Sequence, residues 1–185
     1  MDIIDVTSKE RIEAKAINFG IIYGKTDFGL SQDLNIPVAT AKAYIDSYFN
    51  KYPKIKEFMD EAVESATETG YATTILNRRR YIPEIKASNF IVRNQGKRFA
   101  MNAPIQGSAA DIIKVAMVNV YNRLKENNMK SRLILQVHDE LIVEAVDEEL
   151  EMAEKIVREE MENAQSMDVK LDVDLNTGDS WYETK

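Results

Sequence analysis

The sequence predicts an α+β fold that is mostly helical at first and closes with a small antiparallel sheet. Apolar residues recur at helical spacing through most of residues 8–69 and 89–127. Two runs rich in aliphatic residues follow, at 133–137 and 141–145, and three polar residues separate them. This pattern predicts an antiparallel hairpin with a tight turn. Helices followed by strands are typical of α+β proteins.

Four helices are expected in the first 70 residues, each with a local start or stop signal. Ser8 is the expected N-cap of the first, and Gly24 is its expected stop. Pro37 and Pro53 suit first helical positions, because their missing N–H has no intrahelical partner there. The expected helices are 8–24, 28–35, 37–50 and 53–69.

The rest of the chain is expected to alternate between hairpins and helices. A short hairpin is expected over 71–75 and 79–82, and two helices over 89–106 and 109–127, with Gly107 breaking or kinking the helix between them. An acidic amphipathic helix is expected over 148–164, and the alternation of 169–175 predicts an edge strand.

Composition limits the classes of function. The chain has no cysteine, which excludes disulfides and thiolate metal sites, and no apolar run near the roughly 20 residues that span a bilayer. Residues 1–110 hold 15 Lys and Arg against 13 Asp and Glu, whereas residues 111–185 hold 9 against 18. The net charge of −7 therefore comes from the C-terminal part of the chain. This negative charge disfavours strong non-specific DNA binding by the whole chain, but a polyanion such as DNA interacts with the local charge of the surface that it contacts.

Four residues at four-residue spacing form the first candidate site. Arg11, Lys15, Phe19 and Tyr23 would lie along one face of the first helix. Cations suit phosphates and flat rings suit bases, so this face favours a nucleotide. The alternative is an ordinary amphipathic helix whose aromatic residues belong to the core.

A second polar face is expected on the long helix. Arg98, Asn102 and Gln106 also step by four, and such donors can contact minor-groove acceptors, which every base pair carries. A solvated polar face is the alternative. Pro104 lies between Asn102 and Gln106. A proline inside a helix destabilises it by about 3 kcal/mol, so its presence indicates that a kink is required there.

A third candidate site lies at the turn of the predicted hairpin. His138, Asp139 and Glu140 bring two carboxylates and the one histidine of the chain together. Paired carboxylates suit Mg²⁺, and in two-metal phosphoryl transfer they hold the ions. An Asp that merely makes the turn is the alternative.

A basic cluster is the fourth candidate. Arg78, Arg79 and Arg80 are consecutive at the short hairpin, where they are suited to phosphate contacts. A solvated charged patch is the alternative.

Taken in this order, the motifs resemble those of the family A DNA polymerases, the bacterial DNA polymerase I group. The segment from Arg11 to Gly24 is similar to motif B on the fingers helix, and 137–140 is similar to motif C in the palm. Arg98 to Gly107 is similar to the palm helix that follows the primer–template minor groove. The resemblance implies a fingers subdomain at 1–95 and the C-terminal part of the palm at 96–185.

The resemblance also implies roles for the nucleotide-contacting residues. Arg11 and Lys15 would contact the dNTP triphosphate, and Lys15 would be a candidate proton donor to the pyrophosphate. Phe19 would pack near the sugar and base, which implies discrimination against dideoxynucleotides. Tyr23 would stack at the templating position.

Further roles are implied for DNA and metal. The DNA contacts would come from Arg98, Asn102, Gln106, Arg78, Arg79, Arg80 and His138. His138 would sit near the primer terminus, and Asp139 would bind both catalytic Mg²⁺ ions. Glu140 would be a further ligand or would tune the local charge.

Three departures from the family pattern stand out. Glu10 occupies a position where the family often has Arg, and Asn77 occupies one where Gly is expected. Motif A, which carries the other metal-binding Asp, is absent from residues 1–10, and there is no room for the thumb. The 185 residues are therefore expected to be inactive in template-directed nucleotidyl transfer by themselves.

The expected partners are primer–template DNA, dNTPs and the part of the polymerase that carries motif A and the thumb. An unpaired sheet edge also favours self-association. The expected location is the cytoplasm, at the nucleoid, with no membrane partner. A non-catalytic nucleic-acid-binding or assembly module derived from such a polymerase is the alternative function.

Overall fold

A computed structural model describes residues 6–184 of the chain, apart from the side chain of Lys9. The chain divides into two compact units, Met1–Ile105 and Gln106–Lys185. Helices dominate, and the described residues form two antiparallel sheets of two strands each, which confirms the predicted α+β class. No helix in the described part of the chain is long and apolar enough to cross a membrane.

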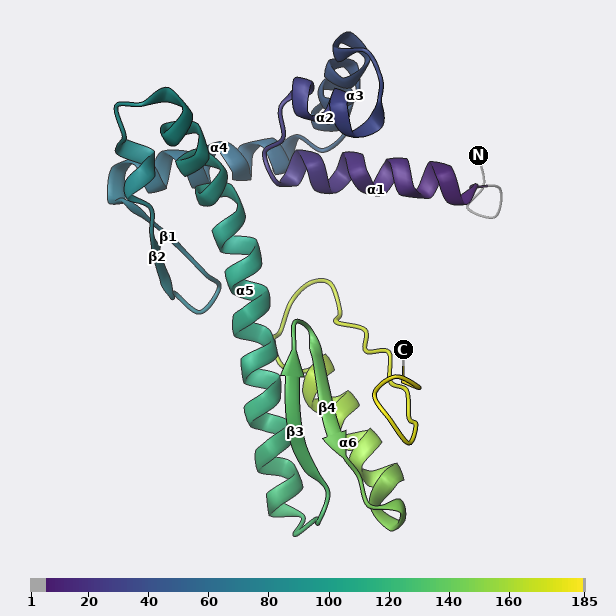
Figure 1. Ribbon diagram of the computed structural model, residues 1–185. Helices are drawn as coiled ribbons and strands as arrows, with labels where there is room; N and C mark the ends of the chain where they lie inside the picture. Colours follow the sequence, from purple (N-terminus) through teal and green to yellow (C-terminus); the bar gives the residue numbers. More distant parts are fainter. Residues whose placement is uncertain (1–5, 185) are drawn as a thin grey trace. The chain divides into compact units, whose positions relative to one another are not determined.

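The first unit consists of four helices, a short hairpin and the beginning of a long helix (Figure 1). Its elements are α1 (Ser8–Ile22), α2 (Asp27–Leu34), α3 (Val38–Lys51), α4 (Pro53–Thr69), β1 (Tyr71–Thr73), β2 (Arg79–Tyr81), η2 (Pro83–Lys86) and the first part of α5 (Phe90–Glu126). The expected helices and hairpin are confirmed to within a few residues. Asn35 and Gly70 end α2 and α4 in the left-handed conformation that these residue types tolerate.

The N-terminus of α1 differs from the prediction by one residue. Thr7 is the N-cap, so the prediction of Ser8 was wrong. The Glu10 amide donates to the Thr7 hydroxyl at 3.3 Å, and the Thr7 amide donates to the Glu10 carboxylate at 2.8 Å. This reciprocal capping box explains Glu10, because a Glu at this position satisfies a backbone donor that Arg could not.

The core of the first unit lies where α4, the short hairpin and η2 meet α5. Its buried members are Ala66, Ala72, Ile82, Ile85, Ala100 and Ala103. A Cβ built on Gly96 would lie 2.4 Å from the Ile85 backbone nitrogen. The close approach of α5 to η2 therefore requires glycine at this position.

Helix α5 is continuous through Gly107, so the predicted break at that residue was wrong. A glycine in a helix costs only about 1 kcal/mol relative to alanine. Buried residues on both sides, Ala103 before it and Ala116 and Val120 after it, supply packing that offsets this cost. Pro104 is also accommodated within the helix.

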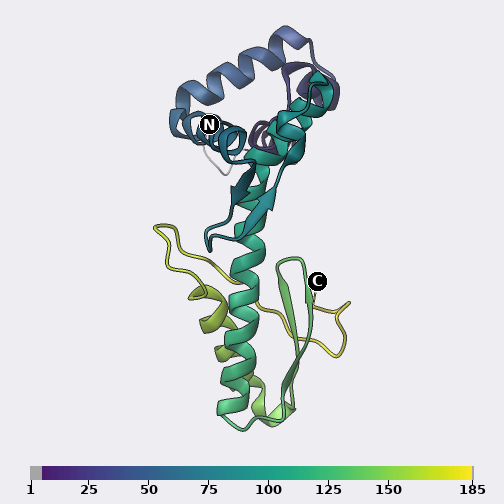
Figure 2. The same ribbon diagram turned by 90° about the vertical axis from the view of Figure 1, so that its left-hand side faces the viewer.

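The second unit contains the end of α5, a hairpin and a second helix. The hairpin strands β3 (Arg132–Val137) and β4 (Glu140–Glu144) run alongside the C-terminal half of α5, with α6 (Leu150–Glu162) next to them after the short η3 (Asp147–Glu149) (Figures 1 and 2). Val137 pairs with Glu140, and a register shift between Leu133 and Leu135 bulges β3. The core residues are Val120, Leu124, Ile156 and Val157, against which Leu141, Val143 and Leu175 pack.

The segment 169–175 forms no strand, so the predicted edge strand was wrong. A strand needs a ladder of backbone partners, and β3 and β4 pair with each other. Arg158 donates to the Val173 carbonyl at 2.8 Å, and Leu175 packs on the core. Side-chain contacts therefore hold the segment in place of a β-ladder.

The two compact units meet within α5, at residues 105 and 106. The expected boundary between fingers and palm lies ten residues earlier, at 95 and 96. Compactness does not define those functional subdomains, so their boundary stays a prediction.

The close contact at Gly96 predicts a stability defect. Gly96→Ala should lower the free energy of unfolding by about 1–3 kcal/mol, because the added methyl meets backbone rather than a flexible side chain. Urea unfolding measures the change. Gln95→Ala, at an exposed position on the same helix, is the control and should change it by less than about 0.5 kcal/mol. Equal changes in the free energy of unfolding for the two variants would contradict the close approach of α5 to η2.

Glu149 joins the start of β3 to η3. Its carboxylate accepts from the Ser131 hydroxyl at 2.6 Å and from the backbone amides of Ser131 and Lys130 at 2.8 and 3.0 Å. The Val146 amide in turn donates to the Ser131 hydroxyl at 3.1 Å. The hydroxyl of Ser131, followed by the two amides, lowers the pKa of Glu149.

This lowered pKa predicts acid sensitivity in the second unit. A carboxylate whose folded pKa lies below its unfolded value stabilises the fold above the unfolded pKa, and the stabilisation is lost as the pH falls through the folded pKa. Glu149→Gln should lower the melting temperature at pH 7, and this difference from the unsubstituted chain should disappear as the pH falls through the lowered pKa of Glu149. Glu148→Gln, at a neighbouring exposed residue, should match the unsubstituted chain. A difference in melting temperature that does not change as the pH falls would contradict the assignment.

Candidate nucleotide and nucleic-acid sites

The predicted face of α1 is exposed in the structure. Phe19 is 45% exposed and Tyr23 39% exposed, and their ring centroids lie 5.9 Å apart. The Lys15 Nζ atom lies 5.8 Å from the Phe19 ring centroid, and Arg11 is exposed one turn earlier. The two aromatic residues are not core residues, so this face combines accessible rings with accessible cations.

The end of α1 explains how this face stays exposed. Ile21 is 2% exposed and anchors the last turn of the helix. Gly24 follows with φ +70°, a conformation that lets the chain turn away directly after Tyr23. Burial on one side of the last turn thus leaves Phe19 and Tyr23 accessible on the other.

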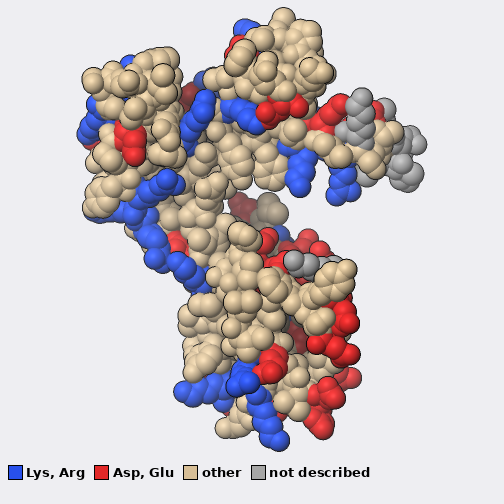
Figure 3. Space-filling model, in the orientation of Figure 1, with Lys and Arg blue, Asp and Glu red and all other residues tan. Residues whose placement is uncertain are grey.

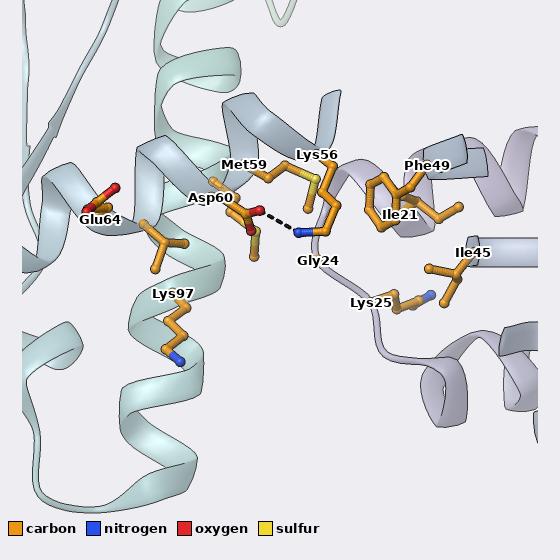
Figure 4. Close-up of a pocket in the computed structure, with 12 residues that line it drawn as sticks. Ile21, Gly24, Lys25, Ile45, Phe49, Lys56, Met59, Asp60, Glu64 and Lys97 are labelled. Atoms are coloured by element: carbon orange, nitrogen blue, oxygen red, sulfur yellow. Dashed lines mark hydrogen bonds and ion pairs between the residues drawn. The ribbon is translucent and has the colours of Figure 1, made fainter. Parts of the chain in front are cut away.

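A cavity of about 460 Å³ lies beside the end of α1 (Figure 4). Ile21, Ile45 and Phe49 contribute to its apolar part, while Lys97 and the ion pair of Lys56 with Asp60 contribute charge. None of the four predicted nucleotide contacts lines this cavity. It is therefore a space behind the end of α1 and not the nucleotide face.

The basic hairpin holds two of its arginines against aromatic rings. The Arg79 guanidinium lies 4.7 Å from the Tyr71 ring centroid, and that of Arg80 lies 4.7 Å from the ring of Phe99. Figure 3 shows Lys and Arg side chains gathered over this hairpin. Such contacts restrict the arginine side chains while leaving donors available for phosphate.

The turn of this hairpin also accounts for Asn77. Its φ of +61° lies in the left-handed region, which glycine and asparagine both tolerate. The departure from the expected glycine therefore leaves the turn intact.

The polar face of α5 contains an unsatisfied group. Arg98 and Gln106 are exposed, and Asn102 lies between them on the continuous helix. The Asn102 Oδ1 atom is buried and has no hydrogen-bond partner in the described structure. A buried acceptor without a donor is unfavourable by about 1–3 kcal/mol.

The hairpin of the second unit presents its carboxylates at a tight turn. His138 has φ +53°, and the side-chain Nε2 of Gln136 donates to the His138 carbonyl at 2.6 Å. The Trp181 indole N–H lies 3.3 Å from the Glu140 carboxylate. The sequence analysis missed Trp181, because 41 residues separate it from Glu140 and no local pattern links the two.

Asp139 and Glu140 line a hollow of about 500 Å³ together with Asp172, Asp174 and Trp181. Oxygen donors of this kind suit Mg²⁺, which proteins hold through one or two carboxylates with substrate phosphates. In the described part of the chain, no group of three or more His, Cys, Asp or Glu side chains is arranged to hold a metal. The turn therefore fits Mg²⁺ in the type of its donors but supplies part of a site.

Comparisons with known proteins agree with these motifs. The family model described as DNA polymerase family A matches residues 1–183. The chain is 53% identical over 181 residues to DNA polymerase I of Bacillus subtilis, covering 98% of the chain and 21% of that protein. It is 52% identical over 185 residues to DNA polymerase I of Caldicellulosiruptor bescii, covering 100% of the chain and 22% of that protein. The chain thus spans about a fifth of these relatives.

A solved structure is similar over the whole chain. It is the POL domain of Pol1 from M. smegmatis in complex with DNA primer-template and dNTP, with a TM-score of 0.96 and 43% sequence identity. The similarity covers 100% of this chain and 32% of that one.

Proposed function

The chain belongs to DNA polymerase family A, and we propose that residues 1–185 supply the nucleotide-binding helix and one part of the metal site for template-directed nucleotidyl transfer. The observation that carries the proposal is the exposed face of α1, where the Lys15 ammonium lies over the accessible ring of Phe19. The dNTP and primer-template in the similar M. smegmatis complex support the same ligand classes.

On α1, the cations contact the phosphates, and the aromatic rings contact the sugar and the bases. Arg11 and Lys15 bind the triphosphate, and the Lys15 ammonium is positioned to give a proton to the departing pyrophosphate. Phe19 packs near the sugar and base, where its lack of a hydroxyl disfavours dideoxynucleotides. Tyr23 stacks at the templating position.

The DNA contacts come from the hairpin and α5. Arg79 and Arg80, held on their aromatic partners, contact phosphates together with Arg78. Arg98, Asn102 and Gln106 contact the minor groove near the nascent base pair. The donors on these side chains suit the minor-groove acceptors that every base pair carries, so the contact does not depend on sequence.

The hairpin turn of the second unit contributes to metal binding. Asp139 would bind both Mg²⁺ ions, and Glu140, held by Trp181, would adjust the charge or add a ligand. When bound, Mg²⁺ neutralises phosphate charge and activates the attacking primer oxygen. His138 lies beside these carboxylates in sequence and orients the primer terminus.

Residues 1–185 should be inactive alone, because they lack the motif A carboxylate that completes such a site. Two features of the second unit support docking of a further segment: the acidic hollow at Asp139 and the outer edges of the two-stranded β3–β4 sheet. The partners are then primer–template DNA, dNTPs and the region with motif A and the thumb. The site of action is DNA in the cytoplasm, at the nucleoid.

A non-catalytic nucleic-acid-binding or assembly module is the second candidate. The arginine–aromatic pairs favour it, because they lie in the first unit and make no use of the Asp139 carboxylate. On this view, Arg98→Ala would abolish the function of the chain, whereas Asp139→Ala would leave it intact.

The proposed nucleotide face predicts a selective defect. In a hybrid enzyme, this chain replaces the matching segment of B. subtilis DNA polymerase I. There, Lys15→Ala should weaken dNTP binding about tenfold or more, because a charge-assisted phosphate contact is lost. Duplex affinity should stay within about twofold. Pre-steady-state incorporation and duplex binding by fluorescence anisotropy measure the two quantities.

Lys54→Ala is the matched control, because Lys54 is an exposed lysine on α4 that pairs with Glu57. It should leave both affinities unchanged. Equal loss of dNTP and duplex affinity in Lys15→Ala would count against the assigned role.

In the described part of the chain, the β3–β4 sheet has two strands, and its outer edges predict self-association. The isolated chain should form dimers or larger species at high concentration, because unpaired backbone groups at a sheet edge can pair with another copy. Light scattering measures the mass as a function of concentration. A monomer at every concentration would refute this prediction.

A further inference from the structure

The N-terminal part of α1 extends beyond its anchored end. Ile21 is 2% exposed in the last turn, whereas Ile12, two and a half turns earlier, is 68% exposed. Lys15 and Arg11 lie on this exposed part. The direction of α1 therefore depends on the contacts made near its C-terminal end.

Apolar packing restrains that end incompletely. The cavity of about 460 Å³ lies beside Ile21 and also touches Ile45 and Phe49 of α3 (Figure 4). Atoms that face a cavity lack the contacts that fix side chains in a close-packed interior. A polar contact between α1 and α3 can therefore set the position of α1.

Tyr48 of α3 makes such a contact. Its hydroxyl donates to the Asn18 Oδ1 atom of α1 at 2.6 Å. The Tyr48 ring is itself held between Phe49 and Tyr52, with centroid separations of 5.9 and 5.2 Å. Burial, and then the neighbouring Tyr52, raise the pKa of Tyr48, so its hydroxyl keeps the proton that it donates.

We propose that Tyr48 and Asn18 are positioning residues for nucleotide selection, because their hydrogen bond fixes the rotation of α1 at the residue that precedes Phe19. A rotation of α1 about its axis would move the Phe19 ring sideways and shift Lys15, which contacts that ring. The hydrogen bond thus determines the positions of the Phe19 ring, which faces the sugar, and of the Lys15 ammonium, which faces the phosphates. This inference rests on the proposed function.

Tyr48→Phe tests the inference, because it removes the hydroxyl and keeps the ring. In the hybrid enzyme, KM for dNTP should rise about two- to tenfold, the range that one hydrogen bond supports. The preference for dNTP over dideoxynucleotide in kcat/KM should narrow by a similar factor, while duplex affinity is unchanged. A merely structural bond would lower the melting temperature and leave this preference unmoved.

Two further variants make the result specific. Tyr44→Phe, one turn earlier on α3 and 44% exposed, is the matched control and should equal the unsubstituted hybrid. Asn18→Asp retains an acceptor for the hydroxyl and should preserve the nucleotide preference, whereas Asn18→Ala should narrow it. If Tyr48→Phe does not fold, the comparison of Asn18→Asp with Asn18→Ala still tests the inference. Asn18 is exposed, so both variants should fold.

The outcomes separate this inference from the proposed function. An unsubstituted hybrid that folds, binds duplex and extends no primer would overturn the proposed function, and this inference with it. An active hybrid in which Tyr48→Phe and Asn18→Ala keep the unsubstituted nucleotide preference would overturn the positioning role alone.

Discussion

The continuity of α5 is the constraint on which both units depend. This 37-residue helix supplies Ala100 and Ala103 to the core of the first unit and Val120 and Leu124 to that of the second. It crosses Pro104 and Gly107, two residues that weaken helices. The buried alanines and aliphatic residues on either side must offset that cost, and Gly96 lets the helix approach η2 closely. A change in α5 would therefore alter the packing of each unit.

The candidate nucleotide face illustrates how a local anchor exposes a functional surface. Adjacent exposed rings beside exposed cations, and not exposure alone, favour a nucleotide on this face. Ile21 and Gly24 hold the last turn of α1, while Phe19 and Tyr23 stay accessible.

Local signals in the sequence predicted most elements, because prolines, caps and hydrophobic spacing act over a few residues. Apart from the N-cap of α1, which differs by one residue, non-local effects produced the errors. Packing overrides the weak helix-breaking tendency of Gly107, and the alternation of 169–175 requires a strand partner that β3 and β4 do not supply. In the same way, four-residue spacing identified Lys15 and Phe19 as neighbours, whereas the contacts of Trp181 with Glu140 and of Tyr48 with Asn18 join distant parts of the chain.

We propose that these 185 residues hold one part of a divided catalytic site. Primer extension by the isolated chain, by the hybrid with B. subtilis DNA polymerase I and by that hybrid with Asp139→Asn tests this proposal. Only the unsubstituted hybrid should extend a primer. Extension by the isolated chain, or undiminished extension by the Asp139→Asn hybrid, would contradict it.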